Sequence, residues 1–238
     1  DTVYQKVLAL ANKEQRGYIT PQDFNLFADQ AQKEIFEQYF FDLNQARRVQ
    51  GNDTVIADID DILEEKISYF EVNNTEAQTA AYNNASNGGK ILPSHVFKVL
   101  RVVRTNSASG ARECELLGNR DFSNCKLAPL TKPSKEFPVA NVMGNVLRCN
   151  VGNASDIAPS NLSYIIKPSA PNWTYAVVNR KAMYNANNNT NHFELHAGEE
   201  VQLVNKILKL AGLAIQQPDV MKAGVGMESL MSKQQSKI

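Results

Sequence analysis

A chain of 238 residues with 43% hydrophobic and 21% charged residues is long enough to bury a core and too apolar to stay disordered. Its 25 basic and 25 acidic residues cancel, but residues 1–72 carry a net charge of −7 and residues 73–193 one of +7. This distribution argues against a single basic face for general nucleic-acid binding. It suits head-to-tail association of copies or binding to a partner protein. The alternative is that the two parts simply have solvent-exposed faces of different charge.

The first part of the chain has the pattern of helices. Residues 3–12 predict a short helix, and a second helix is predicted to begin in "GYITPQDF". There Thr20 can cap the helix, Pro21 fits its first position, and Asp23 favours the N-terminal end of the helix dipole. Apolar side chains at near-helical spacing predict that this helix continues to Gln50.

The segment "DTVIADIDDILEEKISYF", residues 53–70, predicts a third helix with one apolar and one acidic side. The acidic side carries Asp58, Asp61, Glu64 and Glu65. The segment superficially resembles a calcium-binding loop, but it lacks the glycine and the alternating ligands that such a loop needs. A solvated acidic face is therefore the favoured interpretation.

The character of the chain changes after residue 72. The polar run 73–89 predicts a loop or linker, and the proline-rich stretch 126–138 is expected to be irregular. Between turn-forming residues, alternating or β-branched runs predict strands. These expected strands cover residues 95–105, 141–151, 163–168 and 173–184.

A helix is expected again over about 197–214, with a wide apolar stripe and with Glu199 and Glu200 in its first turn, where the helix dipole favours carboxylates. Val201 is assigned to that stripe, and Asn205 and Lys206 to the polar side. The order of elements predicts an α+β fold with the terminal helices packed together. Its expected parts are a helical part over 1–72, a β-rich insertion over 73–193, and a C-terminal helix with a docking tail over 194–238.

The residue types that usually carry chemistry do not form a recognisable site in the sequence. His192 and His196 could share a metal ion only on a helix, and in the expected extended or coil segment they would lie roughly 13 Å apart. No HExxH, GxSxG, GxGxxG or phosphate-binding loop motif occurs. Neither a cofactor nor a metal is expected, no residue is proposed as catalytic, and the chain is not expected to be an enzyme.

The cysteines and asparagines bear on whether the protein belongs to a reducing or an oxidising, secretory compartment. Cys114, Cys125 and Cys149 lack CxxC spacing and are odd in number, so buried thiols are expected. Triplets of the form Asn-x-Ser/Thr begin at Asn52, Asn73, Asn84, Asn153, Asn161, Asn172 and Asn188. They would suit a secreted glycoprotein, but an asparagine-rich chain also produces them by chance.

Two segments resemble a known group of proteins. The run "FELHAGEEVQLVNKILKLAGLAIQQPDV", residues 193–220, and the run "YITPQDFNLFADQAQKEIFEQYF", residues 18–40, are similar to segments of structural proteins from tailed bacteriophages, including crAss-like phages of Bacteroidetes. The resemblance implies a non-enzymatic virion protein of the neck, an adaptor or ring protein of the head-to-tail connector that is assembled in the host cytoplasm. It implies a closed homo-oligomeric ring, commonly a dodecamer, that binds the portal protein and adjacent neck or tail proteins.

Two hypotheses about surfaces follow from this reading. The apolar residues of the tail cannot build a core alone, so we expect the tail to dock on a neighbouring subunit or on the next ring, with folding back on its own helix as the alternative. These residues are Val220, Met221, Val225, Met227, Leu230 and Met231. DNA should pass through such a ring without being read in sequence, so the acidic side formed by Asp58, Asp61, Glu64 and Glu65 is expected to face the channel.

Two other classes of function remain open at this level. A secreted or surface-associated β-rich binding module would explain the asparagine triplets and the long polar loops. An enzyme of unknown type is the third alternative. No membrane association is expected, since no apolar run reaches the roughly 18–20 residues of a membrane-spanning helix.

Overall fold

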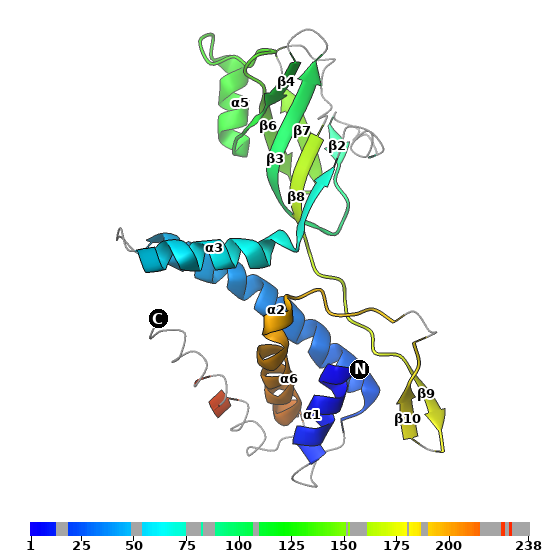
Figure 1. Ribbon diagram of the computed structural model, residues 1–238. Helices are drawn as coiled ribbons and strands as arrows, with labels where there is room; N and C mark the ends of the chain where they lie inside the picture. The colour runs from blue at the N-terminus through cyan, green and yellow to red at the C-terminus, as the bar shows by residue number, and fades with distance from the viewer. Residues whose placement is uncertain are drawn as a thin grey trace. The chain divides into compact units, whose positions relative to one another are not determined.

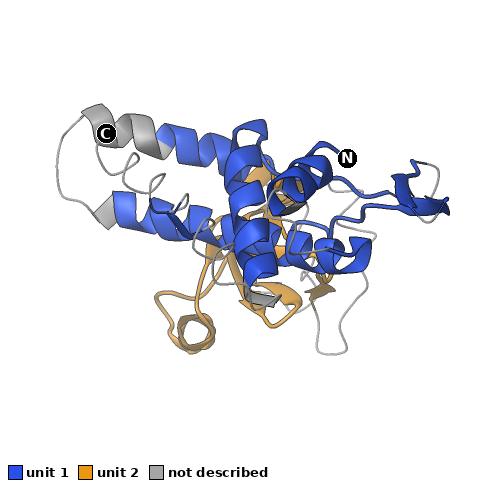
Figure 2. Ribbon diagram, turned by 90° about the horizontal axis from the view of Figure 1, so that it is seen from below, with its two compact units in different colours: residues 1–69, 168–238 blue, residues 70–167 orange. Residues whose placement is uncertain are grey.

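The computed structural model describes residues 1–12, 19–48, 54–74, 82, 89–106, 110–150, 152, 161–179, 181–186, 190–214, 225, 226 and 229. The chain divides into two compact units: unit 1 comprises residues 1–69 and 168–238, and unit 2 comprises residues 70–167 (Figures 1 and 2). Helices predominate in unit 1 and strands in unit 2, so the α+β class expected from the sequence is confirmed.

Unit 1 is built around the long helix α2 (Pro21–Arg48). Three further helices belong to it: α1 (Thr2–Asn12), α3 (Thr54–Ser68) and α6 (Glu200–Ala214), the last preceded by the 3-10 turn η1 (Ala197–Glu199). Helix α2 packs against α3 and α6, and α1 packs against α6 (Figure 1). The expected packing of the terminal helices on one another is therefore confirmed.

The core of unit 1 forms because apolar residues recur every three or four positions along its helices. Its buried apolar residues include Tyr4, Val7, Phe24, Ala28, Ala31, Ile35, Tyr39, Leu63, Ile67, Leu203, Val204, Ile207, Leu208 and Ala211. The predicted stripe on α6 is wrong in detail, since Val201 is exposed while Asn205 and Lys206 are buried. Lys206 has a partner of opposite charge in this position, since its amino group lies 3.6 Å from the Glu34 carboxylate on α2.

The predicted start of α2 is confirmed atom by atom. The Thr20 hydroxyl oxygen accepts the Asp23 backbone N–H at 3.1 Å, and the same hydroxyl donates to the Asp23 carboxylate at 2.5 Å. Pro21 occupies the first helical position, where its missing N–H costs nothing.

The segment after residue 167 belongs with the helices, although the sequence placed the end of the β-rich insertion at residue 193. Polar side chains of α2 hold this returning segment. Gln32 donates to the Ser169 carbonyl at 2.8 Å and accepts the Glu194 N–H at 3.1 Å. Asn25 donates to the Trp173 carbonyl at 3.2 Å and accepts the Trp173 N–H at 2.9 Å. Such long-range bonds leave no periodic trace in the sequence.

Unit 2 contains two four-stranded sheets among its described residues. One sheet has the order β1 (Glu71–Asn74), β8 (Asn161–Ile166), β3 (Val96–Asn106), β4 (Gly110–Glu113), and all its neighbours are antiparallel. The other has the order β2 (Lys90–Ile91), β7 (Val146–Asn150), β6 (Val139–Met143), β5 (Glu115–Leu116), with β5 parallel to β6. Helix α5 (Asn119–Leu127) follows β5 and contacts β6.

Both sheets contribute alternate side chains to one apolar core. Val102 and Leu162 come from the first sheet, and Ala140 and Leu147 from the second, and all four are almost completely buried. The thiols of Cys114 and Cys149 lie in the same core, as expected for buried cysteines, whereas Cys125 on α5 is half-buried.

Two of the predicted strands are hairpins. Residues 141–151 turn at Gly144, which has a φ of 61° and separates β6 from β7. Residues 173–184 turn at Asn179, which has a φ of 51° and separates β9 (Tyr175–Val178) from β10 (Lys181–Tyr184). Glycine and asparagine adopt positive φ more readily than other residues, so each position permits a turn that the alternation of side chains did not reveal. Helix α5 was not predicted at all.

Candidate assembly surfaces

The acidic side of α3 faces solvent in the part of the chain that the structure describes. Asp61, Glu64 and Glu65 are exposed, while Leu63 and Ile67 on the opposite side of the helix are buried. Asp58 lies in α3, but its side chain is outside the described part of the structure. The helix therefore brings three of the four predicted acidic residues onto one accessible surface, and whether this surface faces a channel stays a prediction.

An apolar flank borders this acidic surface. Ile62 has 53% of its surface exposed, and Tyr69, directly after α3, has 60%. Positions 62, 65 and 69 are spaced by three and four residues, so their side chains share one side of the helical turn. Glu65 lies between the acidic residues Asp61 and Glu64 and the apolar residues Ile62 and Tyr69. We refer to Ile62, Glu65 and Tyr69 as the α3 flank.

The predicted docking tail lies almost wholly outside the described residues, which exclude Val220, Met221, Met227, Leu230 and Met231. Val225 is described, in a helical conformation and exposed. Docking of the tail on a neighbour stays a prediction.

His196 caps the helical segment that begins at residue 197. Its Nδ1 accepts the Gly198 N–H at 3.1 Å, and its ring packs edge-on against Tyr69 at 5.5 Å between ring centres. No cluster of three or more histidine, cysteine, aspartate or glutamate side chains suited to a metal occurs among the described residues. The structure thus gives His196 a role at the start of the helix.

A buried ion pair joins the start of α6 to α3. The Glu199 carboxylate, only 7% exposed, lies 2.6 Å from the Lys66 amino group, which also lies 5.6 Å from the centre of the Tyr39 ring on α2. Burial, with the nearby charge of Glu199, raises the pKa of the Tyr39 hydroxyl well above its usual range. Burial likewise raises the pKa of the Asp42 carboxyl. Tertiary packing thus turns Glu199, predicted only as a carboxylate near a helix dipole, into a link between three helices.

The β9–β10 hairpin presents a second exposed apolar surface, which the sequence did not reveal. Paired residues of an antiparallel sheet lie on the same face. The Tyr175–Tyr184 pair packs on Trp173, with ring centres 5.8 and 6.1 Å away. The Ala176–Met183 and Val178–Lys181 pairs lie on the other face, and all four side chains are exposed. We call these four residues the arm face.

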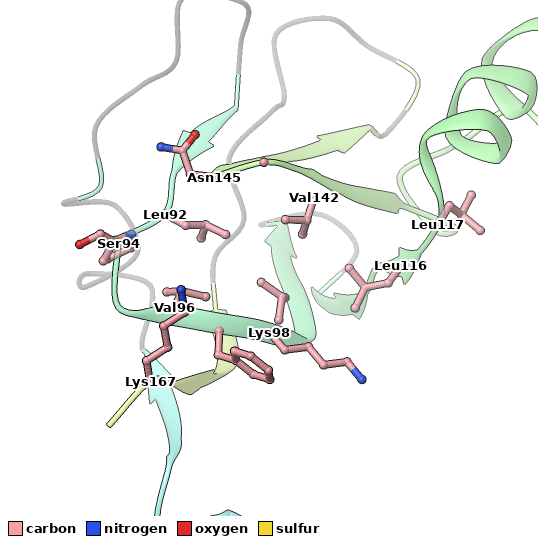
Figure 3. A pocket seen from close by; sticks show the side chains of 13 residues that line it. Leu92, Ser94, Val96, Lys98, Leu116, Leu117, Val142, Asn145 and Lys167 are labelled. Atoms are coloured by element: carbon pink, nitrogen blue, oxygen red, sulfur yellow. The ribbon is translucent and has the colours of Figure 1, made fainter. Parts of the chain in front are cut away.

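Unit 2 has a cavity of about 580 Å³ between its two sheets. Figure 3 shows Val96 on one sheet and Val142 on the other beside this space. Its lining is mostly apolar, and the polar groups that line it are Ser94, Lys98, Asn145 and Lys167. Amino, amide and hydroxyl groups can hold a polar partner, but the described lining includes neither a carboxylate nor an imidazole to move a proton.

Comparison with known proteins gives no family for this chain: no protein-family model matches it, and no curated protein is significantly similar to it. Among the described residues, no helix is long and apolar enough to cross a membrane.

Proposed function

We propose that this chain is a structural virion protein of a tailed bacteriophage, an adaptor or ring protein of the neck. In this proposal, copies of the chain form a closed ring, expected to be a dodecamer, that joins the portal protein to adjacent neck or tail proteins. DNA passes through the ring without sequence readout. The protein acts without a cofactor and without catalysing a reaction.

The observation that carries the proposal is the packing of α2 against α6. The two phage-like segments, 18–40 and 193–220, are far apart in the sequence, yet the helices that they form pack together in unit 1. A bond of 3.1 Å between the side-chain amides of Gln38 and Gln202 is part of this contact. The resemblance therefore concerns one packed body, as expected if that body is the part shared with phage neck proteins.

The charge of α3 is compatible with a DNA channel. A wall rich in lysine and arginine would bind the phosphate backbone and slow the passage of DNA, whereas carboxylates repel phosphate. We therefore assign the side of α3 that carries Asp61 and Glu64 to the channel, with Asp58 and Glu65 at its border.

One specific contact counts against the alternative of a glycosylated, secreted module. Asn172, the first residue of one Asn-x-Ser/Thr triplet, accepts a hydrogen bond of 3.1 Å from Asn25 through its side-chain oxygen. Its backbone also pairs with Asn191. A glycan would attach to the nitrogen of this amide and would have to fit beside its part-buried contact with α2.

Electron microscopy tests the proposal in two steps. Negative-stain images of the purified protein are expected to show closed rings with a central opening, and antibody labelling is expected to mark the neck of virions that contain the protein. A monomer whose mass is increased by glycans would instead favour the secreted module. Labelling of the capsid or the tail fibres, with the neck unlabelled, would contradict the proposal.

A further inference from the structure

The β9–β10 hairpin is an arm fixed at its base. Its arm face is exposed, and so is Val177 on the opposite face. At the base, the Thr174 hydroxyl donates to the Asn185 carbonyl at 2.5 Å, and the Trp173 ring packs at a tilt against Tyr4, with 3.9 Å between ring centres. On the arm face, Val178 is 48% exposed and Met183 is 56% exposed. Figures 1 and 2 both show the hairpin projecting from the helices of unit 1.

This exposure is costly for so small a sheet. A two-stranded hairpin is only marginally stable in water by itself, and exposed apolar side chains grouped on one surface usually mark a contact with another molecule. The aromatic base stabilises the near end of the hairpin but leaves the arm face without a cover among the described residues. The arm face is therefore suited to packing against a partner.

The α3 flank has the complementary chemistry. Ile62 and Tyr69 offer exposed apolar surface, and Glu65 offers a carboxylate beside them. The arm face combines Ala176, Val178 and Met183 with the amino group of Lys181. Apolar surface can thus meet apolar surface while the opposite charges of Lys181 and Glu65 face each other, a match that favours correct pairing over wrong pairing.

The two surfaces cannot meet within one copy of the chain. The base of the hairpin is bonded to Asn25 near the start of α2, while the Lys66 side chain of α3 lies over Tyr39 farther along the same helix. Asn25 and Tyr39 are fourteen positions apart in the helix, which places the two attachment points roughly 21 Å apart along α2. The hairpin also projects away from α3 (Figures 1 and 2).

We propose that the arm face of one copy packs on the α3 flank of a second copy of this chain. The contact is heterologous, because two different surfaces meet, and repetition of such a contact produces a closed ring or an open filament. This inference rests on the proposed neck function, to which it adds the interface that joins neighbouring subunits. The acidic residues Asp61 and Glu64 beside the flank lie outside this proposed contact.

Site-specific cross-linking tests the contact. Two variants are prepared in a Cys125→Ser background, one with Met183→Cys and the other with Ile62→Cys, and they carry tags of different size. A short bismaleimide is expected to join them into a heterodimer when they are mixed, with little product from either variant alone. A chain that carries both substitutions is expected to give a ladder of higher oligomers.

A matched pair measures random collisions. Leu130 in unit 2 is fully exposed and apolar, so Leu130→Cys mixed with Met183→Cys offers an equally accessible thiol outside the proposed contact. The Met183–Ile62 pair should exceed this control several-fold. An equal yield from both pairs would overturn the inference.

A charge exchange adds a test of Lys181 and Glu65. Lys181→Glu should lower the cross-linking of Met183→Cys to Ile62→Cys several-fold, and Glu65→Lys in the second chain should restore it. Loss of cross-linking without restoration would contradict the assigned pairing of these charges.

The two proposals fail separately. Cross-linking without antibody labelling of the virion neck would leave the contact between copies standing and remove the neck function. Labelling of the neck without specific cross-linking would support the neck function and remove the proposed contact between copies.

Discussion

At the scale of single residues, the link between Glu199 and Lys66 shows how burial changes the meaning of a side chain. Glu199 and Glu200 are neighbours in the sequence and looked equivalent at a helix N-terminus. In the structure, Glu199 is buried against Lys66, whereas Glu200 pairs with Lys6 at 2.9 Å where both side chains are substantially exposed. A glutamate–lysine pair is therefore expected to contribute differently to stability at position 199 and at position 200.

Glu199→Gln is expected to lower the free energy of unfolding of unit 1 by about 3 kcal/mol, because it leaves the Lys66 ammonium in a largely buried site without its counter-charge. Glu200→Gln is the matched control and should cost less than about 1 kcal/mol, since exposed ion pairs contribute little. Urea denaturation followed by circular dichroism measures both. Equal losses of unfolding free energy for the two variants would show that the buried pair contributes no more to stability than the exposed pair.

At the scale of elements, α3 illustrates what an amphipathic pattern can and cannot say. The pattern predicted a helix with an acidic side, and the described residues confirm that Asp61, Glu64 and Glu65 are exposed opposite the core. The apolar flank beside them was hidden, because the sequence pattern places Ile62 with Leu63 on the apolar side of the helix, whereas Ile62 is exposed in the structure. Only the position of α2 decides that Leu63 is buried and Ile62 is not.

The channel assignment predicts the effect of reversing charge on α3. A ring of the Asp61→Lys, Glu64→Lys variant should bind short duplex DNA, with an affinity that falls steeply as salt rises, whereas the unsubstituted ring should bind weakly. Fluorescence anisotropy of labelled DNA at several salt concentrations measures this. Glu65 is left unchanged because it belongs to the proposed subunit contact.

The control for this variant carries the same change in net charge on exposed acidic residues of unit 2, as Glu115→Lys with Asp121→Lys. If both variants bind DNA equally well, the effect reflects total charge, and the assignment of α3 to the channel is wrong.

At the scale of the whole molecule, the helical unit is discontinuous in sequence. Residues 1–69 and 168–238 make one compact unit around a β-rich insertion of residues 70–167. The sequence indicated a change of character near both ends of the insertion. It misplaced the second by about 25 residues, because the returning segment is irregular or β-paired and yet bonded to α2 through Asn25 and Gln32.

Removal of residues 219–238 tests the predicted docking tail at this scale. If the tail binds a neighbouring subunit, the truncated chain should form smaller oligomers than the full chain at the same concentration, as measured by mass photometry. Its thermal unfolding should be unchanged, since the described core of unit 1 contains none of these residues. A truncated chain that forms rings of unchanged size would contradict docking between subunits.

The residue pattern alone was enough to predict the helices at both ends, the capped start of α2 and the β-rich middle, and it contains no familiar catalytic motif. These features depend on local physics: side-chain periodicity, capping and the restricted backbone of proline. The hairpin turns at Gly144 and Asn179 lay within reach of such reasoning, since both residue types permit positive φ.

Three features could be seen only in the folded chain: which carboxylate is buried, which apolar residues stay exposed, and that the segment after residue 167 belongs to unit 1. Burial depends on what packs against a face, and the packing partners of Glu199, Ile62 and Met183 are set by contacts between residues distant in the chain. In the sequence, the residues of the arm face have the pattern of an ordinary strand. It becomes a candidate assembly surface because no described part of the same chain covers it.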